Sequence, residues 1–390
     1  MMNRQQLLDR ARKLVPVLAA RAQDCEDLRQ VPSETIADFV EAGFYKIAQP
    51  AEFGGFELSP LVLFEVAMEL AKGCPSSGWC LCLIGVHNWE LGILDPRIAQ
   101  DIWGEDPDAR ISSSYAPFGS ARKVQGGYEL SGRWPWSSGC DHCTWVNVGV
   151  RSADPDDPLP PCSLLVPRSD YEIDDTWYVA GLKGTGSKDI VIDKAYVPEH
   201  RLHNSLMSFL MQDPGREHFT APCYRYPFGI VFVYCLASVT QGIGEGALEA
   251  VEAIMREKIH SYDRSRIGED PAVLQCLSQA KHTLGLNRRA IVGAFAEMDT
   301  TLEAGNALTI EQRAELKWRA QRLAQDNATI VTDLLKAAGG SAMRLDNPMQ
   351  RYFRDIHAAT NHTFLNVGRG AMSMGAIQLG GGDAAIDKMI

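Results

Sequence analysis

Apolar residues near the start of the chain recur at spacings of three and four, the period of a helix with one buried face. One such stripe consists of Leu7, Leu8, Ala11, Leu14, Val15 and Leu18. Pro32-Ser-Glu-Thr-Ile opens a second predicted helix that ends near Gly43, and the stretch from Leu61 to Ala71 is apolar enough for a buried helix. We therefore predict a helical N-terminal domain over residues 1–110.

From residue 111 the period of the pattern changes to two, which is typical of strands with one buried face. Val146, Val148 and Val150 alternate with Asn147 and Gly149, and Gly126-Gly127 separates two short strand-like runs as in a hairpin. The acidic, proline-rich segment 153–161 is predicted to be an exposed loop between strands. These features predict a small β domain over residues 111–210.

Long helical patterns return in the last part of the chain. One apolar face comprises Val239, Ile243, Ala247, Val251 and Ile254, and another comprises Leu316, Ala320, Leu323, Ala324 and Val331. The second pattern stops at Gly339-Gly340, a natural helix end. We predict a C-terminal helical bundle over residues 211–390, an α+β fold class, and association of the bundle with copies of itself.

Composition narrows the possible functions. The chain has 390 residues, with 38 basic and 49 acidic side chains and a net charge of −11. No long basic run is present, so a nucleic-acid surface is not expected. The first residues lack the apolar core of a signal peptide, and no long charge-free apolar window was recognised, so no membrane span is expected. We expect a cytoplasmic protein whose ten cysteines are reduced thiols.

Two local motifs suggest chemistry that their surroundings do not support. Cys140-Asp-His142-Cys143 could begin a zinc site, but the other close pair, Cys80 and Cys82, would point apart in either a strand or a helix, so no metal is expected. Gly242-Ile-Gly244-Glu-Gly246 resembles a dinucleotide-binding loop, yet it lies inside a helical pattern without a preceding strand. Small residues that let two helices approach closely are the better interpretation, so no nicotinamide site is expected.

Two distant stretches carry the candidate active-site residues. Trp134-Pro-Trp-Ser-Ser138-Gly places an indole and two hydroxyls at the end of a predicted strand. Arg351-Tyr-Phe-Arg-Asp-Ile-His357 continues to His362 and offers two histidines. Taken alone, a buried tryptophan or a helical histidine is more often a packing residue than a ligand.

Several further motifs occur in a characteristic order along the chain. They are Glu41-Ala-Gly43-Phe-Tyr, Pro50-Ala-Glu-Phe-Gly54-Gly55, the stretch from Trp134 to Gly139, the stretch from Gly181 to Pro198, Arg264-Ser-Arg-Ile-Gly268, Gln275, Gly339-Gly340 and Arg351-Tyr-Phe-Arg-Asp355. Together they resemble the acyl-CoA dehydrogenase fold and, within it, the oxygenase components of two-component flavin-dependent monooxygenases that hydroxylate phenols. The resemblance implies an N-terminal helical domain, a middle β-barrel-like domain and a C-terminal four-helix bundle, assembled as a homotetramer.

The resemblance also implies roles for single residues. His362 stands where the dehydrogenases commonly carry a catalytic glutamate, and His87 looks like a second active-site histidine. Ser138 looks like the hydroxyl at the reactive edge of the flavin. The remaining implied positions are Trp134 and Ser137 beside the flavin, Arg264, Gln275, Gly339 and Gly340 on its nucleotide tail, and Ser113, Arg225 and His357 on the substrate side. Lys336 departs from the glutamine often found before the Gly-Gly pair.

The implied chemistry uses reduced flavin and O₂ through a C4a-hydroperoxyflavin that hydroxylates an aromatic substrate. The cofactor is expected to be reduced FAD or FMN, with FAD slightly favoured, supplied by a separate flavin reductase. We expect His362 to be the general base, with a pKa near the working pH, and His87 to orient substrate or peroxide. An acyl-CoA dehydrogenase-type flavoprotein, an N- or S-oxygenase of the same fold and a helical scaffold that has lost its flavin site remain the alternatives.

Overall fold

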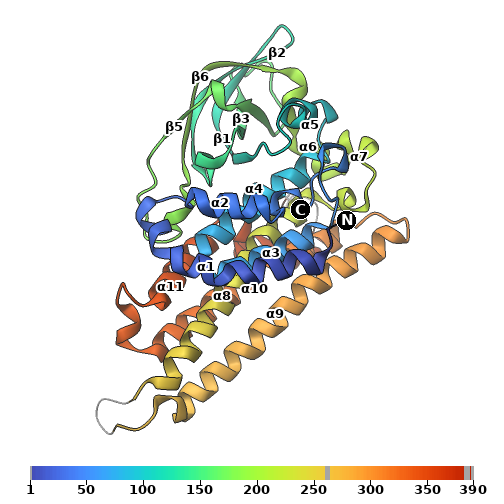
Figure 1. The fold of residues 1–390 in the computed structure, drawn as a ribbon. Helices are drawn as coiled ribbons and strands as arrows, with labels where there is room; N and C mark the ends of the chain where they lie inside the picture. Colours follow the sequence, from blue (N-terminus) through green and yellow to red (C-terminus); the bar gives the residue numbers. More distant parts are fainter. Residues whose placement is uncertain (1, 260–263, 382–386, 388–390) are drawn as a thin grey trace.

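The computed structural model describes residues 2–259, 264–381 and 387. In the sequence, helices precede and follow one β domain. In space, this domain lies at one end of the molecule (Figure 1). The described helices are α1 Arg4–Leu28, α2 Ser33–Glu41, α3 Pro60–Gly73, α4 Pro75–Leu91, α5 Pro96–Trp103, α6 Ser205–Leu210, α7 Gly215–His218, α8 Phe228–Glu257, α9 Pro271–Glu303, α10 Ile310–Ala338, α11 Pro348–Thr360 and α12 Val367–Gln378.

The helical ends agree with the local signals in the sequence. The carboxamide of Asn3 caps α1, and Thr309 caps α10 with the side chain of Gln312 completing a capping box. Gly339 ends α10 with a φ of 72°, a backbone conformation in which glycine carries no steric penalty. The predicted helix stop at Gly339 is therefore confirmed.

The β domain is one seven-stranded sheet with the order β5-β6-β2-β1-β3-β4-β7. Its strands are β1 Ile111–Val124, β2 Gly127–Ser137, β3 Trp145–Ser152, β4 Cys162–Pro167, β5 Glu172–Asp174, β6 Lys188–Pro198 and β7 Leu202–Asn204. The hairpin between β1 and β2 turns at Gly126, as the sequence predicted. Side chains from β1, β2, β3, β4 and β6 fill a second hydrophobic core, separate from that of the helices.

The three glycines of the segment 242–246 lie inside α8 and allow close helix packing. A Cβ on Gly242 would lie 2.3 Å from the carbonyl oxygen of Met68 on α3, and one on Gly246 would lie 2.8 Å from Lys72. A side chain at either position would force α3 and α8 apart. The prediction that these glycines serve helix packing rather than nucleotide binding agrees with this geometry.

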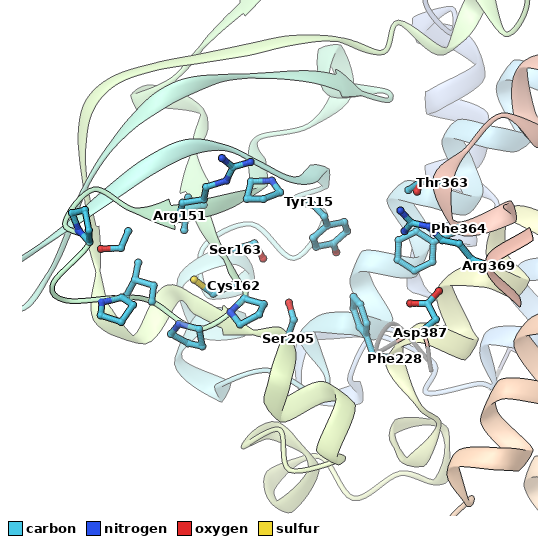
Figure 2. A pocket seen from close by; sticks show the side chains of 18 of the residues that line it. Tyr115, Arg151, Cys162, Ser163, Ser205, Phe228, Thr363, Phe364, Arg369 and Asp387 are labelled. Carbon is cyan, nitrogen blue, oxygen red and sulfur yellow. The ribbon is translucent and has the colours of Figure 1, made fainter. Parts of the chain in front are cut away.

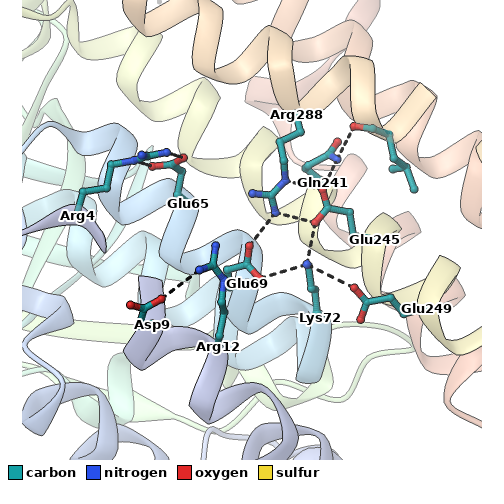
Figure 3. Close-up of polar contacts among 11 residues, drawn as sticks. Arg4, Asp9, Arg12, Glu65, Glu69, Lys72, Gln241, Glu245, Glu249 and Arg288 are labelled. Atoms are coloured by element: carbon teal, nitrogen blue, oxygen red, sulfur yellow. Dashed lines mark hydrogen bonds and ion pairs between the residues drawn. The ribbon is translucent and has the colours of Figure 1, made fainter. Parts of the chain in front are cut away.

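Ion pairs add to the apolar contact between α3 and α8. Lys72 on α3 lies 3.2 Å from Glu69 and 3.3 Å from Glu245 on α8, and Arg288 on α9 binds Glu245 at 2.7 Å (Figure 3). Burial lowers the pKa of Lys72, but the surrounding carboxylates outweigh it and raise the pKa overall. This charged cluster joins α3 of the N-terminal helical region to α8 and α9 of the C-terminal region. None of its residues belongs to the β domain.

One sequence expectation about α8 needs correction. The helix is long and apolar enough to cross a membrane, although no such window was recognised in the sequence. However, 94% of its most apolar window is buried inside the protein. The apolar residues of α8 are therefore accounted for by the core, where the helix packs against α3, α4, α10 and α11.

Candidate active site

One face of α4 borders the junction between the helices and the β domain. Trp79, Leu83 and His87 follow one another at four-residue spacing, so they share this face. Leu83 is the one partly exposed side chain within the otherwise buried helix, which indicates that open space lies beside this stripe. Four-residue spacing thus places His87 and Trp79 along the same boundary.

Ser138 follows β2 and meets the stripe at Trp79. Its hydroxyl lies 2.8 Å from the hydroxyl of Ser187, and the indole N–H of Trp79 donates to Ser138 Oγ at 3.3 Å. Gly139, with a φ of 71°, makes the turn that follows, and a Cβ there would lie 2.8 Å from Ile84 of α4. A glycine is required at this position because the turn packs directly against the helix.

His362 lies in the loop after α11 and contacts the other side of Trp79. The imidazole packs edge-on against Trp79 at 6.1 Å and lies 5.8 Å from the ring of Phe364. Its Nδ1 accepts the backbone N–H of Phe364 at 3.3 Å. Burial lowers the pKa of His362 to about 4, so the imidazole is neutral at pH 7. The expectation of a pKa near the working pH is wrong for this histidine.

His87 lies in polar surroundings at the opposite end of the stripe. Its Nδ1 is 2.7 Å from Glu90 Oε2, and the hydroxyl of Tyr115 donates to the same oxygen at 2.7 Å. The His87 ring also packs against Phe232 at 5.6 Å. Phe232 contacts Phe364 at 6.4 Å, so a continuous series of rings connects His87 with His362.

Glu90 is a buried carboxylate that four donors surround. Besides His87 and Tyr115, the amide of Asn147 donates to Oε1 at 3.2 Å, and His203 Nδ1 lies 2.9 Å from that oxygen. Burial acts to raise the pKa of Glu90, but hydrogen bonds from His203 and His87 outweigh it and lower the pKa to about 2. Glu90 is therefore ionised throughout the physiological range.

A cavity of about 720 Å³ adjoins this cluster, between the β domain and the C-terminal helices. Tyr115, Phe228 and Phe364 lie toward one side of it, and Arg151 and Cys162 lie toward the other (Figure 2). The predicted exposed loop between β3 and β4 supplies another wall, from Asp154 to Pro161. This volume suits a small-molecule ligand of several rings, and its aromatic lining suits a flat one.

Other predicted residues of the reaction centre have mixed positions. Ser113 is partly exposed on β1. Burial raises the pKa of Tyr115, and the Ser113 side chain acts in the opposite direction. Ser137 is buried and donates to Ser112 at 3.0 Å. His357 lies exposed on α11, where its Nε2 is 3.0 Å from the Thr332 hydroxyl of α10. Arg225 is exposed on the surface before α8. None of the predicted residues His87, Ser113, Ser138, Arg225, His357 and His362 is itself among the residues that line the cavity. Tyr115 and Phe364, which do line it, contact His87 and His362.

Trp134 does not point toward the candidate site. It is fully buried in the core of the β domain, and its indole N–H donates to the carbonyl of Gly149 at 2.6 Å. The exposed indole of this motif is that of Trp136, whose side chain is 60% exposed and whose φ is 68°. The structure thus corrects the expectation that Trp134 lies beside a flavin ring, because that side chain has no exposed surface to offer.

The residues expected to hold a nucleotide tail lie away from the β domain. Arg264 precedes η8 Ile267–Glu269, in the connection between α8 and α9, and Gln275 is exposed on the first turns of α9. Gly339 and Gly340 follow α10 and are tied to α8, because Lys258 donates to the carbonyl of Ala338 and to Ser341. The start of α9 lies at the end of the bundle opposite the β domain (Figure 1). The predicted tail residues therefore belong to the bundle, whereas Ser138 follows strand β2 of the β domain.

Sequence reasoning missed Trp79, Glu90, Tyr115, His203 and Phe232. A partial signal existed for Trp79, since it precedes His87 by two helical turns. No comparable signal links Glu90 of α4 with His203 of β7, because these residues are far apart along the chain and their side chains meet only in the folded protein.

Comparison with known proteins places this geometry in a family. Residues 2–92 match the model of the acyl-CoA dehydrogenase N-terminal domain, and residues 234–367 match that of the acyl-CoA dehydrogenase C-terminal domain. The flavin-dependent monooxygenase oxygenase subunit HsaA of Rhodococcus jostii is 34% identical, over 91% of this chain and 93% of that protein. The FADH₂-dependent resorcinol hydroxylase, oxygenase component, of a Rhizobium species is 30% identical, over 92% and 90%.

A solved structure supports the same assignment. The crystal structure of the HsaA monooxygenase from Mycobacterium tuberculosis matches with a TM-score of 0.94 and 33% identity, over the whole of both chains. The fold class predicted from the motifs is thus confirmed. The chain belongs to the acyl-CoA dehydrogenase-fold family and, within it, to the oxygenase subunits of flavin-dependent monooxygenases.

Proposed function

We propose that this protein uses externally supplied reduced flavin and O₂ to hydroxylate a phenol-type aromatic compound. One observation supports this most strongly: Trp79 joins the Ser138 hydroxyl to His362, and the adjoining cavity is lined by Tyr115, which contacts Glu90, and by Phe364, which contacts His362. A flavin edge and a phenol could be held on these two sides. Membership of the monooxygenase family supplies the reaction class.

The residues around Ser138 fit a flavin. Ser138 Oγ lies in a cluster of hydroxyls, with Thr185 Oγ1 2.7 Å from Ser187 Oγ, so it can both donate and accept hydrogen bonds. Trp136, three-fifths exposed beside this cluster in sequence, offers a flat apolar surface. Bound reduced flavin would activate O₂, and these protein groups would hold the ring and exclude water. We propose Ser138 and Trp136 as ring contacts.

The positions of Arg264, Gln275, Gly339 and Gly340 support a shared cofactor site. They lie around the start of α9 and the end of α10, in the helical bundle, whereas Ser138 follows strand β2 of the β domain. We propose that they bind the tail of a flavin held by a neighbouring subunit, in a homotetramer. A tail long enough to reach them favours FAD over FMN.

A separate flavin reductase is the expected partner. The glycine-rich stretch at Gly242 packs α8 against α3, and no other dinucleotide-binding loop was found in the sequence. Relatives are named oxygenase subunits or components, which agrees with a reductase on another chain. We propose that reduced flavin reaches this protein from such a reductase.

Anaerobic mixing with reduced FAD, followed by rapid addition of O₂ and a phenol such as resorcinol, tests the proposal. We expect oxidation kinetics that differ from those of free reduced flavin, and a product with one added oxygen atom from ¹⁸O₂. Oxidation indistinguishable from that of free flavin, with no labelled product from any phenol tested, would contradict it. Oxygen delivered only to amines or sulfides would favour the N- or S-oxygenase alternative.

A further inference from the structure

The two histidines of the site differ in which ring nitrogen carries the proton, because their neighbours bind different groups. His362 Nδ1 accepts the backbone N–H of Phe364, so this nitrogen carries no proton. Because the low pKa of His362 keeps the ring neutral, its single proton is on Nε2. His362 can therefore donate a hydrogen bond to a ligand through Nε2, but it cannot accept one there.

The protonation of His203 follows from its neighbours. Arg216 Nε donates to Asp213 Oδ2 at 2.7 Å, so Asp213 is a carboxylate, and the Ser208 hydroxyl donates its one proton to Asp213 Oδ1 at 2.5 Å. Ser208 Oγ must then accept from His203 Nε2, which lies 2.7 Å away. His203 Nδ1 lies 2.9 Å from Oε1 of ionised Glu90, an ion-pair distance at which an unprotonated nitrogen would face the lone pairs of the carboxylate, so we infer that both ring nitrogens of His203 carry protons.

His203 is thus an imidazolium that balances the charge of Glu90, while Arg216 balances Asp213. Glu90, His203 and Asp213 are buried, with exposed fractions of 1% for Glu90 and His203 and 3% for Asp213. A buried carboxylate needs a cationic partner, and His203 meets that need. No second cation is required beside Glu90, so His87 can remain neutral.

The tautomer of His87 is then determined. Glu90 Oε2 accepts from His87 Nδ1, so the single proton of neutral His87 lies on Nδ1 and Nε2 carries a lone pair. Among the described residues, the hydrogen bonds of His87 all involve Nδ1, and Nε2 makes none. Glu90 and Tyr115 are the titratable groups that face this ring in the described part of the chain.

We propose that His87, positioned by the Glu90–His203 ion pair, is the general base of the hydroxylation and that His362 is a hydrogen-bond donor. This inference rests on the proposed function and exchanges the two roles expected from the sequence. The phenol O–H bond breaks, its proton moves to His87 Nε2, and the electron pair stays on the phenolate oxygen. The resulting imidazolium keeps its Nδ1–H on Glu90, which stabilises the new positive charge.

The ionisation of a bound phenol tests this without flavin. The probe is 4-nitrophenol, because its phenolate absorbs at a longer wavelength than the neutral phenol. We expect the unsubstituted protein to lower the apparent pKa of the bound probe relative to free solution. His87→Asn and Glu90→Gln should abolish this shift, whereas His362→Asn should leave a shift of the same sign.

The matched control for Glu90→Gln is Glu69→Gln. Glu69 is also a buried, ion-paired glutamate, but it lies in the cluster between α3, α8 and α9, away from the cavity. Glu69→Gln should keep the probe shift at its original size. Circular dichroism and the unfolding midpoint of each variant identify any variant that does not fold.

His203→Asn removes the cation that balances Glu90. It should also abolish the pKa shift of bound 4-nitrophenol.

The outcomes separate the two proposals. If His362→Asn removes the shift and His87→Asn retains it, the exchanged roles are refuted while the proposed function stands. If the unsubstituted protein neither binds 4-nitrophenol nor changes its ionisation, a phenol site is absent and both proposals fail. Loss of the shift in Glu69→Gln as well would mean that any buried charge change disturbs the cavity, and it would contradict the specific role of Glu90.

Discussion

His87 and His362 lie behind Tyr115 and Phe364, two residues that line one cavity, and they have two kinds of surroundings. Around His362 are rings, those of Trp79 and Phe364, and burial lowers the pKa of its imidazole to about 4. His87 instead belongs to a series of polar contacts that continues through Glu90, His203 and Ser208 to Asp213. Apolar surroundings make a histidine a neutral donor, whereas a buried carboxylate orients it as a base. The residue type alone therefore does not determine the role.

The largest difference between the two histidines should appear in the hydroxylation step. We expect His87→Asn to slow product formation by roughly 10²–10⁴-fold, the usual contribution of a general base. His362→Asn should have a smaller effect on that step, because an asparagine amide can still donate a hydrogen bond. Single-turnover product yield at pH 7 measures both. Equal losses in the two variants would remove the distinction.

Glu90→Gln tests whether the carboxylate supports His87. A glutamine can turn its N–H₂ toward His87 Nδ1, which would move the proton to Nε2 and remove the lone pair from the cavity. We expect a loss of about 10²-fold, the lower end of the contribution of a general base. It should be partly relieved at higher pH, where the phenol ionises without help. A pH profile of the same shape as that of the unsubstituted protein would speak against positioning.

Trp79→Phe tests whether the surroundings of His362 serve flavin binding rather than ionisation of the phenol. The change removes the hydrogen bond to Ser138 but keeps an aromatic ring against His362. Loss of one such hydrogen bond corresponds to about 1 kcal/mol. We therefore expect reduced flavin to bind about fivefold more weakly, with little change in the ionisation of bound 4-nitrophenol. Titration of each ligand by fluorescence or absorbance distinguishes the two effects.

The smallest effect concerns stability against pH. His362 has a folded-state pKa of about 4, below its ordinary value of 6.5. Between these values the unfolded chain binds more protons at this site than the folded one, so stability falls as pH is lowered from 6.5 to 4. His362→Asn should show a shallower fall in the free energy of unfolding across this window. A slope identical to that of the unsubstituted protein would mean that the imidazole is not buried in its neutral form.

The sequence was sufficient for the fold because its long elements carry regular apolar patterns. The stripe of Leu7, Leu8 and Ala11, the hairpin at Gly126 and the helix end at Gly339 are all found where they were predicted. Each of these three features depends on local spacing or on one glycine. None of them requires knowledge of distant parts of the chain.

The candidate site was predicted only in part, for two physical reasons. Trp134 and Trp136 share a face by strand alternation, but the register of β2 shifts between Trp134 and Ser137 and the φ of Trp136 is 68°, so the two indoles diverge. Local alternation cannot reveal that shift. The chain from Glu90 to Asp213 joins residues of α4, β7 and the segment around α6, and such pairing exists only in the folded protein.

The protonation sites of His87 and His362 are the most direct test of the account. Nitrogen NMR of flavin-free protein labelled with ¹⁵N-histidine distinguishes a protonated from an unprotonated ring nitrogen. The His87→Asn and His362→Asn variants assign the two signals among the nine histidines. The account predicts a proton on Nδ1 of His87 and on Nε2 of His362 at pH 7. Protonated Nε2 on His87, or protonated Nδ1 on His362, would contradict it.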